Sequence, residues 1–241
     1  MTVFRFSDLD LRDPHTFLNF FVCRDFTDTT IFGFSANSYF QDAVQKDSGS
    51  DGFLDTNYLL VFKPLDPTGS GTMEVHTRSS CTAPLASPIC DSTLALITLT
   101  TYSTSGSGEC LAAFPGTLHP YTPAITYPNA PCFASGTFDL TLTIAGILLT
   151  LRDVTMSGTF VGNPATSITN GFMRGFINES DANVSILPSS IPLIGGKSLS
   201  SILPGGTGCC ASVSDKDTNR GVSGWWFYFN FTAPQVTYLG P

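Results

Sequence analysis

Charged side chains are scarce in this sequence, and glutamate is the scarcest of them. Asp, Glu, Lys and Arg make up 12% of the 241 residues, against roughly a quarter in an average globular protein. Sixteen of the 19 acidic residues are Asp, which favours a turn-rich chain because Asp bonds its own backbone in turns. The formal net charge of −8 repels phosphate backbones, so we expect no nucleic-acid partner.

Long apolar runs are also missing. The best candidate, residues 140–151, contains several threonines and is too short to cross a bilayer as a helix. Residues 1–21 include five charged side chains and no apolar signal-peptide core. We therefore expect no transmembrane span in this chain. If the protein is exported, its signal segment is expected upstream of Met1.

Catalytic motifs are absent as well. The sequence has no Gly-x-Ser-x-Gly nucleophile motif and three histidines, His15, His76 and His119. It has no closely spaced Cys/His cluster of the kind that holds zinc, and no carboxylate pair stands out from the turn acids. We expect a protein that is not an enzyme, and a cryptic secreted hydrolase ranks third among the functional hypotheses.

Cysteine, in contrast, is plentiful. Seven cysteines are too many idle thiols for a reducing compartment and predict disulfides and an extracellular or cell-surface location. Local spacing favours pairing of Cys81 with Cys90 and of Cys110 with Cys132. Cys23 then remains to pair with one member of the Cys209–Cys210 doublet. The odd count leaves one thiol that is free or bonded to another molecule.

Alternating apolar residues predict a mainly β fold. Residues 138–144 and 147–151 alternate with period two around a turn at Ala145-Gly146, and the apolar phase then slips near Arg152-Asp153, which predicts a β-bulge. Residues 225–232 predict a second strong strand. The remaining predicted strands are shorter: 3–6, 17–22, 30–34, 58–62, 72–77 and 94–102. Together they predict an antiparallel β-sandwich or a barrel-like sheet, stapled by disulfides.

One or two short helices are expected within this fold. Apolar residues at Ile168, Phe172 and Phe176 recur every four positions, which is typical of an amphipathic helix. A single helical turn is expected at 198–203. Five prolines in 115–131 predict a long irregular connection. We expect one large domain, residues 1–241, with a possible subregion of short helices and loops at 163–210.

Two acidic loops, the first at residues 47–55 and the second at 215–219, have compositions that suit calcium. Calcium prefers six to eight oxygen ligands from a flexible loop. The alternative for both loops is an ordinary solvated turn, with Lys216 and Arg220 neutralising the second. Asp8, Asp10 and Asp13 more often mark an exposed face. The predicted calcium ligands are Asp47, Gly49, Asp51 and Asp55 in the first loop, and Asp215, Asp217 and Asn219 in the second.

Aromatic residues suggest a ligand-binding alternative. Trp226 and Tyr228 lie on the face of the C-terminal strand opposite Trp225, Phe227 and Phe229. If that face is exposed, these rings can stack on sugars. The competing interpretation is that they pack beneath another part of the chain.

Several segments together resemble a family of bacterial surface lipoproteins of unassigned function. They are 149–153 (LTLRD), 157–162 (SGTFVG), 170–176 (NGFMRGF), 203–208 (LPGGTG) and 214–217 (SDKD), with the 47–55 loop and the Cys81/Cys90 pair. The resemblance implies an exported, lipidated precursor and transfers no catalytic residue. It further implies that Cys209 is the odd thiol and that Cys23 pairs with Cys210.

The sequence therefore predicts a non-enzymatic structural or adhesive β protein of the cell exterior, and this prediction includes a subunit of an extracellular assembly. A spare cysteine or an exposed strand edge would supply the assembly contact. The alternative is a calcium-assisted module that binds a glycan or another ligand.

Overall fold

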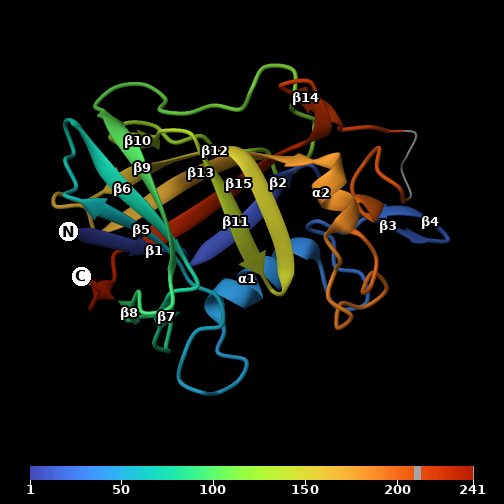
Figure 1. The fold of residues 1–241 in the computed structure, drawn as a ribbon, viewed down its shortest axis with the longest axis horizontal. Coiled ribbons are helices and arrows are strands. Elements are labelled where there is room, and N and C mark those ends of the chain that lie inside the picture. The colour runs from blue at the N-terminus through green and yellow to red at the C-terminus, as the bar shows by residue number, and fades with distance from the viewer. Residues whose placement is uncertain (209–212, 241) are drawn as a thin grey trace.

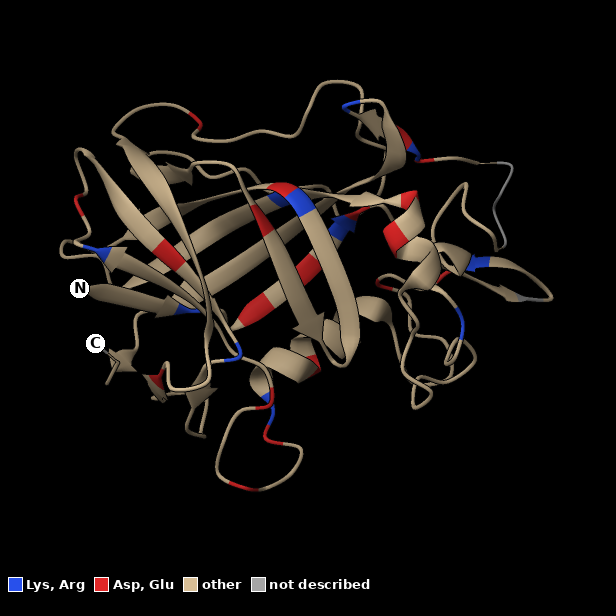
Figure 2. Cartoon of the chain, in the orientation of Figure 1, with Lys and Arg blue, Asp and Glu red and all other residues tan. Residues whose placement is uncertain are grey.

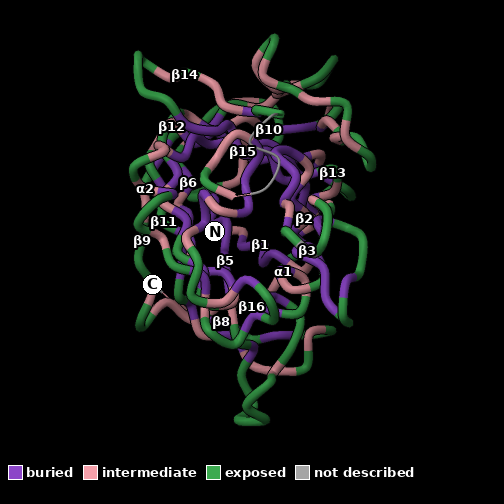
Figure 3. The backbone as a smooth tube through the Cα atoms, turned by 90° about the vertical axis from the view of Figure 1, so that its right-hand side faces the viewer, coloured by how far each residue is buried: buried purple, intermediate pink, exposed green. Residues whose placement is uncertain are grey.

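The computed structural model describes residues 1–208 and 213–240, and it is mainly β (Figure 1). Neighbouring strands of its main sheet are antiparallel, and two short helices accompany them. Buried residues gather at the centre, with exposed residues mostly in the surrounding loops (Figure 3). The predicted fold class is confirmed.

The regular elements of the described residues follow in chain order. The strands are β1 (Thr2–Arg5), β2 (Asp8–Asp13), β3 (Phe17–Phe20), β4 (Val22–Asp25), β5 (Tyr58–Lys63), β6 (Ser70–Thr77), β7 (Ser80–Cys81), β8 (Ile89–Asp91), β9 (Leu96–Ser105), β10 (Cys132–Ser135), β11 (Phe138–Ile144), β12 (Ile147–Val161), β13 (Ser167–Asn178), β14 (Asp217–Asn219), β15 (Val222–Pro234) and β16 (Thr237–Tyr238). The helices are α1 (Ala36–Gln45), α2 (Glu179–Val184) and the 3-10 turn η1 (Leu199–Ser201).

The main sheet closes on itself. Its strand order is β1-β5-β6-β9-β10-β12-β13-β15-β14, and β2 also pairs with β15. Phe6 and Ser7 are all that separates β1 from β2, so one N-terminal segment pairs with β5 at its beginning and with β15 at its end. The two ends of the strand order are thereby joined, and the sheet has a barrel-like form.

Packed aromatic side chains fill the interior of the closed sheet. The Phe62 ring lies 5.8 Å from Phe4, 4.9 Å from Tyr102, 5.1 Å from Phe133 and 5.9 Å from Phe160, measured between ring centroids. All five rings are buried. The centre is therefore a solid core that holds the strands in register.

The segment predicted as an amphipathic helix is instead strand β13, and that prediction is wrong. Ile168 faces the main core, whereas Phe172 and Phe176 belong to a separate apolar cluster. A register shift between Ile168 and Gly171 moves the apolar residues from one face to the other. Because both faces of β13 are buried, its apolar residues do not alternate with polar ones. The resulting spacing of four residues between Ile168, Phe172 and Phe176 is the same as that of an amphipathic helix.

The proline-rich connection, residues 109–131, covers the second of these faces. Leu111, Phe114 and Tyr127 pack against the outer cluster. Asn230 Nδ2 donates to Thr126 O at 2.6 Å, and Thr126 N–H donates to Asn230 Oδ1 at 2.9 Å. The predicted irregular connection is present and acts as a cover for β13 and β15.

The β11–β12 hairpin follows the sequence prediction closely. Ala145 and Gly146 both have positive φ, 52° and 81°, as a two-residue hairpin turn of the primed type requires. The pairing of β12 slips between Arg152 and Thr155, and Asp153 there has φ of 50°. The predicted turn and the predicted bulge are both confirmed.

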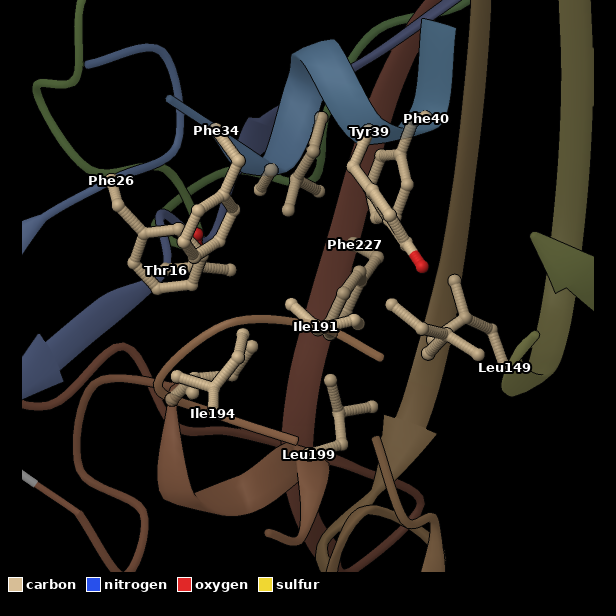
Figure 4. A pocket seen from close by; sticks show the side chains of 14 residues that line it. Thr16, Phe26, Phe34, Tyr39, Phe40, Leu149, Ile191, Ile194, Leu199 and Phe227 are labelled. Carbon is tan, nitrogen blue, oxygen red and sulfur yellow. The ribbon is translucent and has the colours of Figure 1, made fainter. Parts of the chain in front are cut away.

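Helix α1 was not foreseen. Ser35 caps its N-terminus by accepting from Ser38 N–H, while Ser38 Oγ accepts from Ser35 N–H. Phe40 and Val44 on its buried side join the main core. Between α1 and residues 191–202 lies an apolar cavity of about 30 Å³ (Figure 4), which is room for about two waters at most and offers them no polar partner.

Two disulfide bonds among the described residues connect segments outside the central core. Cys81–Cys90 links β7 to β8, and Cys110–Cys132 fastens the start of the connection to β10. Both predicted pairs are confirmed. The predicted Cys23–Cys210 bond and the odd thiol at Cys209 involve positions outside the described residues and stay predictions.

The predicted subregion at 163–210 is partly integrated into the main sheet through β13. The helical turn expected at 198–203 is present as η1. Within the described residues, no helix has the length and apolar character needed to cross a membrane.

Candidate functional site

Three distant segments meet where β2 ends. Asp13 is the last residue of β2, His119 and Tyr121 belong to the connection 109–131, and Asp215 precedes β14. β2 reaches this point because it pairs with β15, in a register that shifts between Tyr228 and Phe229. The Cys110–Cys132 bond and the packing of the connection against β13 and β15 hold His119 and Tyr121 close to this end of β2.

The side chains of Asp13, His119 and Asp215 form a compact cluster. His119 Nδ1 lies 3.6 Å from Asp13 Oδ1, and His119 Nε2 lies 3.2 Å from Asp215 Oδ1. One ligand atom from each residue falls within 4.8 Å of the others. Asp13 and Asp215 are each 2% exposed, so water screens their charges poorly.

The second oxygen of each carboxylate is already occupied. The His119 backbone N–H donates to Asp13 Oδ2 at 2.8 Å, and the Tyr121 hydroxyl donates to Asp215 Oδ2. Tyr121 stacks on His15, with ring centroids 3.9 Å apart. His15 Nδ1 in turn lies 2.5 Å from Asp25 Oδ2. These contacts fix the orientation of both carboxylates.

Some buried polar atoms here have no hydrogen bond within the described part of the chain. They are His15 Nε2, His119 Nδ1 and Asp215 Oδ1. His119 is thus near both carboxylates without aligned hydrogen bonds from its ring to these atoms. Buried polar atoms without partners are rare in folded proteins and ask for an explanation such as a bound ion or water.

Burial dominates the electrostatics of the cluster. It raises the pKa of Asp13 to about 7, although hydrogen bonding and charge from His119 oppose the shift. Burial likewise raises the pKa of Asp215. It also raises the pKa of Tyr121, and the bond that Tyr121 donates to Asp215 adds to that shift. For Asp25, bonds from His15 and Thr27 outweigh burial and lower the pKa.

The raised pKa of Asp13 predicts a pH-dependent stability. Because its pKa is about 7 in the folded state and 3.8 ordinarily, the folded protein holds a proton between these values that the unfolded chain releases. Stability contributed by Asp13 therefore falls as pH rises from 4 to 7, by up to about 4 kcal/mol. Urea unfolding of the wild type and of Asp13→Asn in metal-free buffer measures the difference. Equal pH slopes in both proteins would show that Asp13 ionises normally.

A groove of about 200 Å³ adjoins the cluster. It is lined by Asp13, His119 and Tyr121 together with Arg12 and several residues of the connection. His119 is 28% exposed in its side chain, so the cluster is open to solvent on this side. The arrangement offers a cation two carboxylate oxygens, one imidazole nitrogen and access for water.

The first predicted calcium loop lies elsewhere, between α1 and β5. Asp47 accepts from the N–H groups of Asp51 and Gly52 at 3.0 and 2.9 Å, and Asp55 accepts from Ser48 N–H at 3.1 Å. Asp51 accepts from Phe53 N–H, and Gly49 lies in the same exposed turn. These bonds account for the loop without an ion, so calcium there stays a prediction.

The second predicted loop is divided by the structure. Asp215 turns to His119 and Tyr121, whereas Asp217 and Asn219 lie on β14. Asn219 Nδ2 donates to Asp153 Oδ2 at 2.7 Å. Asp215 is thus brought together with Asp13 and His119, and no contact of Asn219 with Asp215 is seen among the described residues.

The predicted aromatic binding face is covered. Trp226 is 6% exposed and Tyr228 is 0% exposed. Phe114 packs on Trp226 with ring centroids 4.6 Å apart, and Tyr228 bonds Thr117. The expectation of an outward ligand-binding pair is wrong, and the competing interpretation, packing beneath another segment, is correct.

Sequence reasoning did not foresee the roles of Asp13 and His119. Asp13 was assigned to an exposed face, yet it is buried. His119 stands out in the sequence only as a histidine in a proline-rich stretch close to a tyrosine. That pattern does not indicate which residues His119 contacts. The described residues show no hydrogen bond between a serine hydroxyl and a histidine ring.

A second feature of interest is the edge of β9. Pairing with β10 covers Tyr102 to Ser105, and Thr101 O accepts from Gly136 N–H. Beyond that point β11 diverges from β9 (Figure 1). By the alternation of antiparallel pairing, the N–H and C=O groups of Ile97 and Leu99 point away from β6. No backbone bond from the described residues reaches them.

A groove of about 440 Å³ opens beside the first residues of this edge, lined by Leu94 and Leu96 on one side and by Thr141 and Thr143 of β11 on the other. Exposed apolar side chains surround it. They are Leu94 (75%), Leu96 (53%), Ile97 (53%) and Leu99 (66%).

Comparison with known proteins finds no match for this chain among protein-family models, curated proteins or solved structures.

Proposed function

We propose that this chain is a non-enzymatic structural protein of the cell exterior whose copies associate through the open edge of β9. The observation that carries the proposal is the pair of unpaired backbone positions at Ile97 and Leu99. Their hydrogen-bonding groups need partners, and another strand edge supplies them in the right spacing.

Composition of the edge supports this role. Folded proteins protect exposed edges with charged residues, prolines or bulges. Residues 92–108 contain none of the four charged residue types and no proline, and β9 is without charge along its length (Figure 2). Its first half is also rich in exposed leucine and isoleucine. An uncharged edge of this kind favours pairing of β9 with a strand of another molecule.

A second copy of the chain is the partner that the charge distribution favours. Each copy has a net charge of −8, so approach is least opposed where neither surface is charged. Antiparallel pairing of β9 with its symmetry mate about Thr98 places Ile97 opposite Leu99 on both sides of the twofold axis. The apolar side chains of one copy then cover those of the other.

The disulfides support the proposed location. Cys81–Cys90 and Cys110–Cys132 persist in oxidising surroundings outside the cytoplasm. The resemblance to surface lipoproteins adds a lipid anchor upstream of this chain to the proposal. The alternative, a calcium-assisted glycan-binding module, loses its aromatic platform because Trp226 and Tyr228 are buried.

Sedimentation velocity over a series of concentrations tests the association. A contact made by one strand pair and its flanking leucines is at the small end of specific interfaces, which bury about 1,200–2,000 Å². We therefore expect the wild type to dimerise reversibly and Leu99→Lys to remain monomeric, because each lysine would lie opposite Ile97 of the other copy and would bring an unpaired charge into the apolar contact.

The matched control is Val184→Lys, which places the same charge at a side chain that is 76% exposed at the end of α2. This variant is expected to dimerise like the wild type. A wild type that stays monomeric at every concentration contradicts the proposal, and so does a Leu99→Lys protein that dimerises normally.

A further inference from the structure

We infer that Asp13, His119 and Asp215 form a binding site for one divalent transition-metal ion of the zinc class. This site is separate from the β9 edge and does not depend on the proposed association. It also differs from the two acidic loops that the sequence suggested for calcium, since it joins one residue of the second loop to two residues from elsewhere.

The orientation of the carboxylates is the first argument. Each has one oxygen fixed by a donor that is not a candidate metal ligand, Asp13 Oδ2 by the His119 backbone N–H and Asp215 Oδ2 by the Tyr121 hydroxyl. The other oxygen of each, Oδ1, is the one closest to the His119 ring. Metal-binding carboxylates are commonly held in this way by outer hydrogen bonds that orient the free oxygen.

The atoms left without partners are the second, independent argument. Asp215 is 2% exposed and its Oδ1 has no hydrogen bond within the described residues, and His119 Nδ1 has none either. His119 Nε2 lies 3.2 Å from Asp215 Oδ1, and His119 Nδ1 lies 3.6 Å from Asp13 Oδ1. Neither approach satisfies the unpartnered atom, Asp215 Oδ1 in the first and His119 Nδ1 in the second. Buried polar atoms that are left without a hydrogen bond call for a further species to satisfy them, such as a bound ion, and one ligand atom from each of the three residues lies within 4.8 Å of the others.

The ligand types select the class of cation. Zinc accepts imidazole nitrogen and carboxylate oxygen in four-coordinate sites and often leaves one position to water. Calcium requires six to eight oxygens, which two buried aspartates and a histidine do not supply. The groove of about 200 Å³ that reaches the cluster gives water access to the fourth position.

An ion at this place would act as a cross-link. It would connect the end of β2, the connection 109–131 and the segment before β14, which are distant in sequence. The competing arrangement is a protonated His119 that bridges the two carboxylates with no metal. The two arrangements differ in whether the purified protein takes up zinc.

Isothermal titration calorimetry with zinc chloride, after removal of metals by a chelator and of the chelator by dialysis, tests the inference. We expect one Zn²⁺ per chain, a higher melting midpoint with zinc than without it, and no calcium binding at this cluster. Asp215→Asn is expected to weaken zinc binding by more than about 100-fold. Tyr121→Phe should weaken it by about 10- to 100-fold, because it removes an outer hydrogen bond.

The matched control is Asp217→Asn, which neutralises a neighbouring acid outside the cluster and should leave zinc affinity within about threefold, as expected for a residue that orients no ligand. If Asp215→Asn fails to fold by near-ultraviolet circular dichroism, His119→Gln, at a more exposed position, replaces it. Failure of the wild type to bind zinc overturns the inference. Zinc binding that survives both Asp215→Asn and His119→Gln overturns it as well.

Discussion

Replacement of Phe62 by alanine is expected to lower the free energy of unfolding by about 3–5 kcal/mol, the range for a large side chain removed from a packed core. Phe62 is 0% exposed and its ring meets four other rings inside the closed sheet. The cavity left behind cannot collapse easily, because β5 is held between β1 and β6. Guanidinium unfolding with the disulfides intact, followed by tryptophan fluorescence, measures the loss.

The matched control is Leu239→Ala, since Leu239 is 73% exposed near the C-terminus. We expect this change to stay within about 0.5 kcal/mol of the wild type. A loss below about 1 kcal/mol for Phe62→Ala would mean that the interior is loosely packed, contrary to the fold described above.

Arg5 is the second position at which a large effect is expected. Its guanidinium is buried and pairs with no carboxylate of the described residues. It donates to Asn57 Oδ1, Phe6 O, Val44 O and Thr56 O at 2.6, 2.8, 2.6 and 3.1 Å. Burial lowers its pKa to about 10, so it stays charged at neutral pH. It joins β1 to the end of α1 and to the segment before β5.

Arg5→Met should destabilise the protein by about 3–5 kcal/mol, because it leaves several buried acceptors without donors. Methionine keeps most of the bulk of the side chain, so the loss reports on the hydrogen bonds rather than on a cavity. Arg5→Lys should also destabilise it, since an ammonium cannot reproduce the planar fork of donors. Arg24→Met, at an exposed position of β4, serves as the control. Urea unfolding that shows Arg5→Met and Arg24→Met to be equally stable would exclude this role for Arg5.

Local signals in the sequence predicted the local structure well. Ala145-Gly146 and the phase slip at Asp153 are properties of a few adjacent residues, and both appear as a turn and a bulge. The core face of β15 could be predicted for the same reason, because Trp225, Phe227 and Phe229 alternate without interruption. Short-range patterning decides such features wherever one face of a strand is buried.

Features that depend on long-range covering could not be predicted in this way. β13 is buried on one side by the core and on the other by residues 109–131, so its pattern lost the period of two. The sequence left open whether Trp226 faces solvent or packs beneath another segment, because nothing local shows that Phe114 covers it. Helix α1 has a capping box formed by Ser35 and Ser38, but the sequence signature of such a box has Glu or Gln at the position of Ser38, so the pattern did not indicate a helix.

The metal cluster illustrates the same limit more sharply. Asp13, His119 and Asp215 are separated by about a hundred residues at each step, and one sequence contains no signal that links them. Closure of the sheet by β2 and the path of the connection bring them together. The fold of the chain brings these three residues together, so the cluster could be recognised only in the structure. Sequence analysis had named one of the three, Asp215, as a metal ligand.

Hydrogen exchange at the amides of Ile97 and Leu99 tests the central claim, that β9 presents an open edge through which copies pair. Measured by mass spectrometry with short overlapping peptides, these two amides are predicted to exchange rapidly in dilute solution and to become protected as concentration rises, while the Leu99→Lys protein shows no such change. Amides that exchange at the same rate at every concentration, whether fast or slow, would contradict the claim.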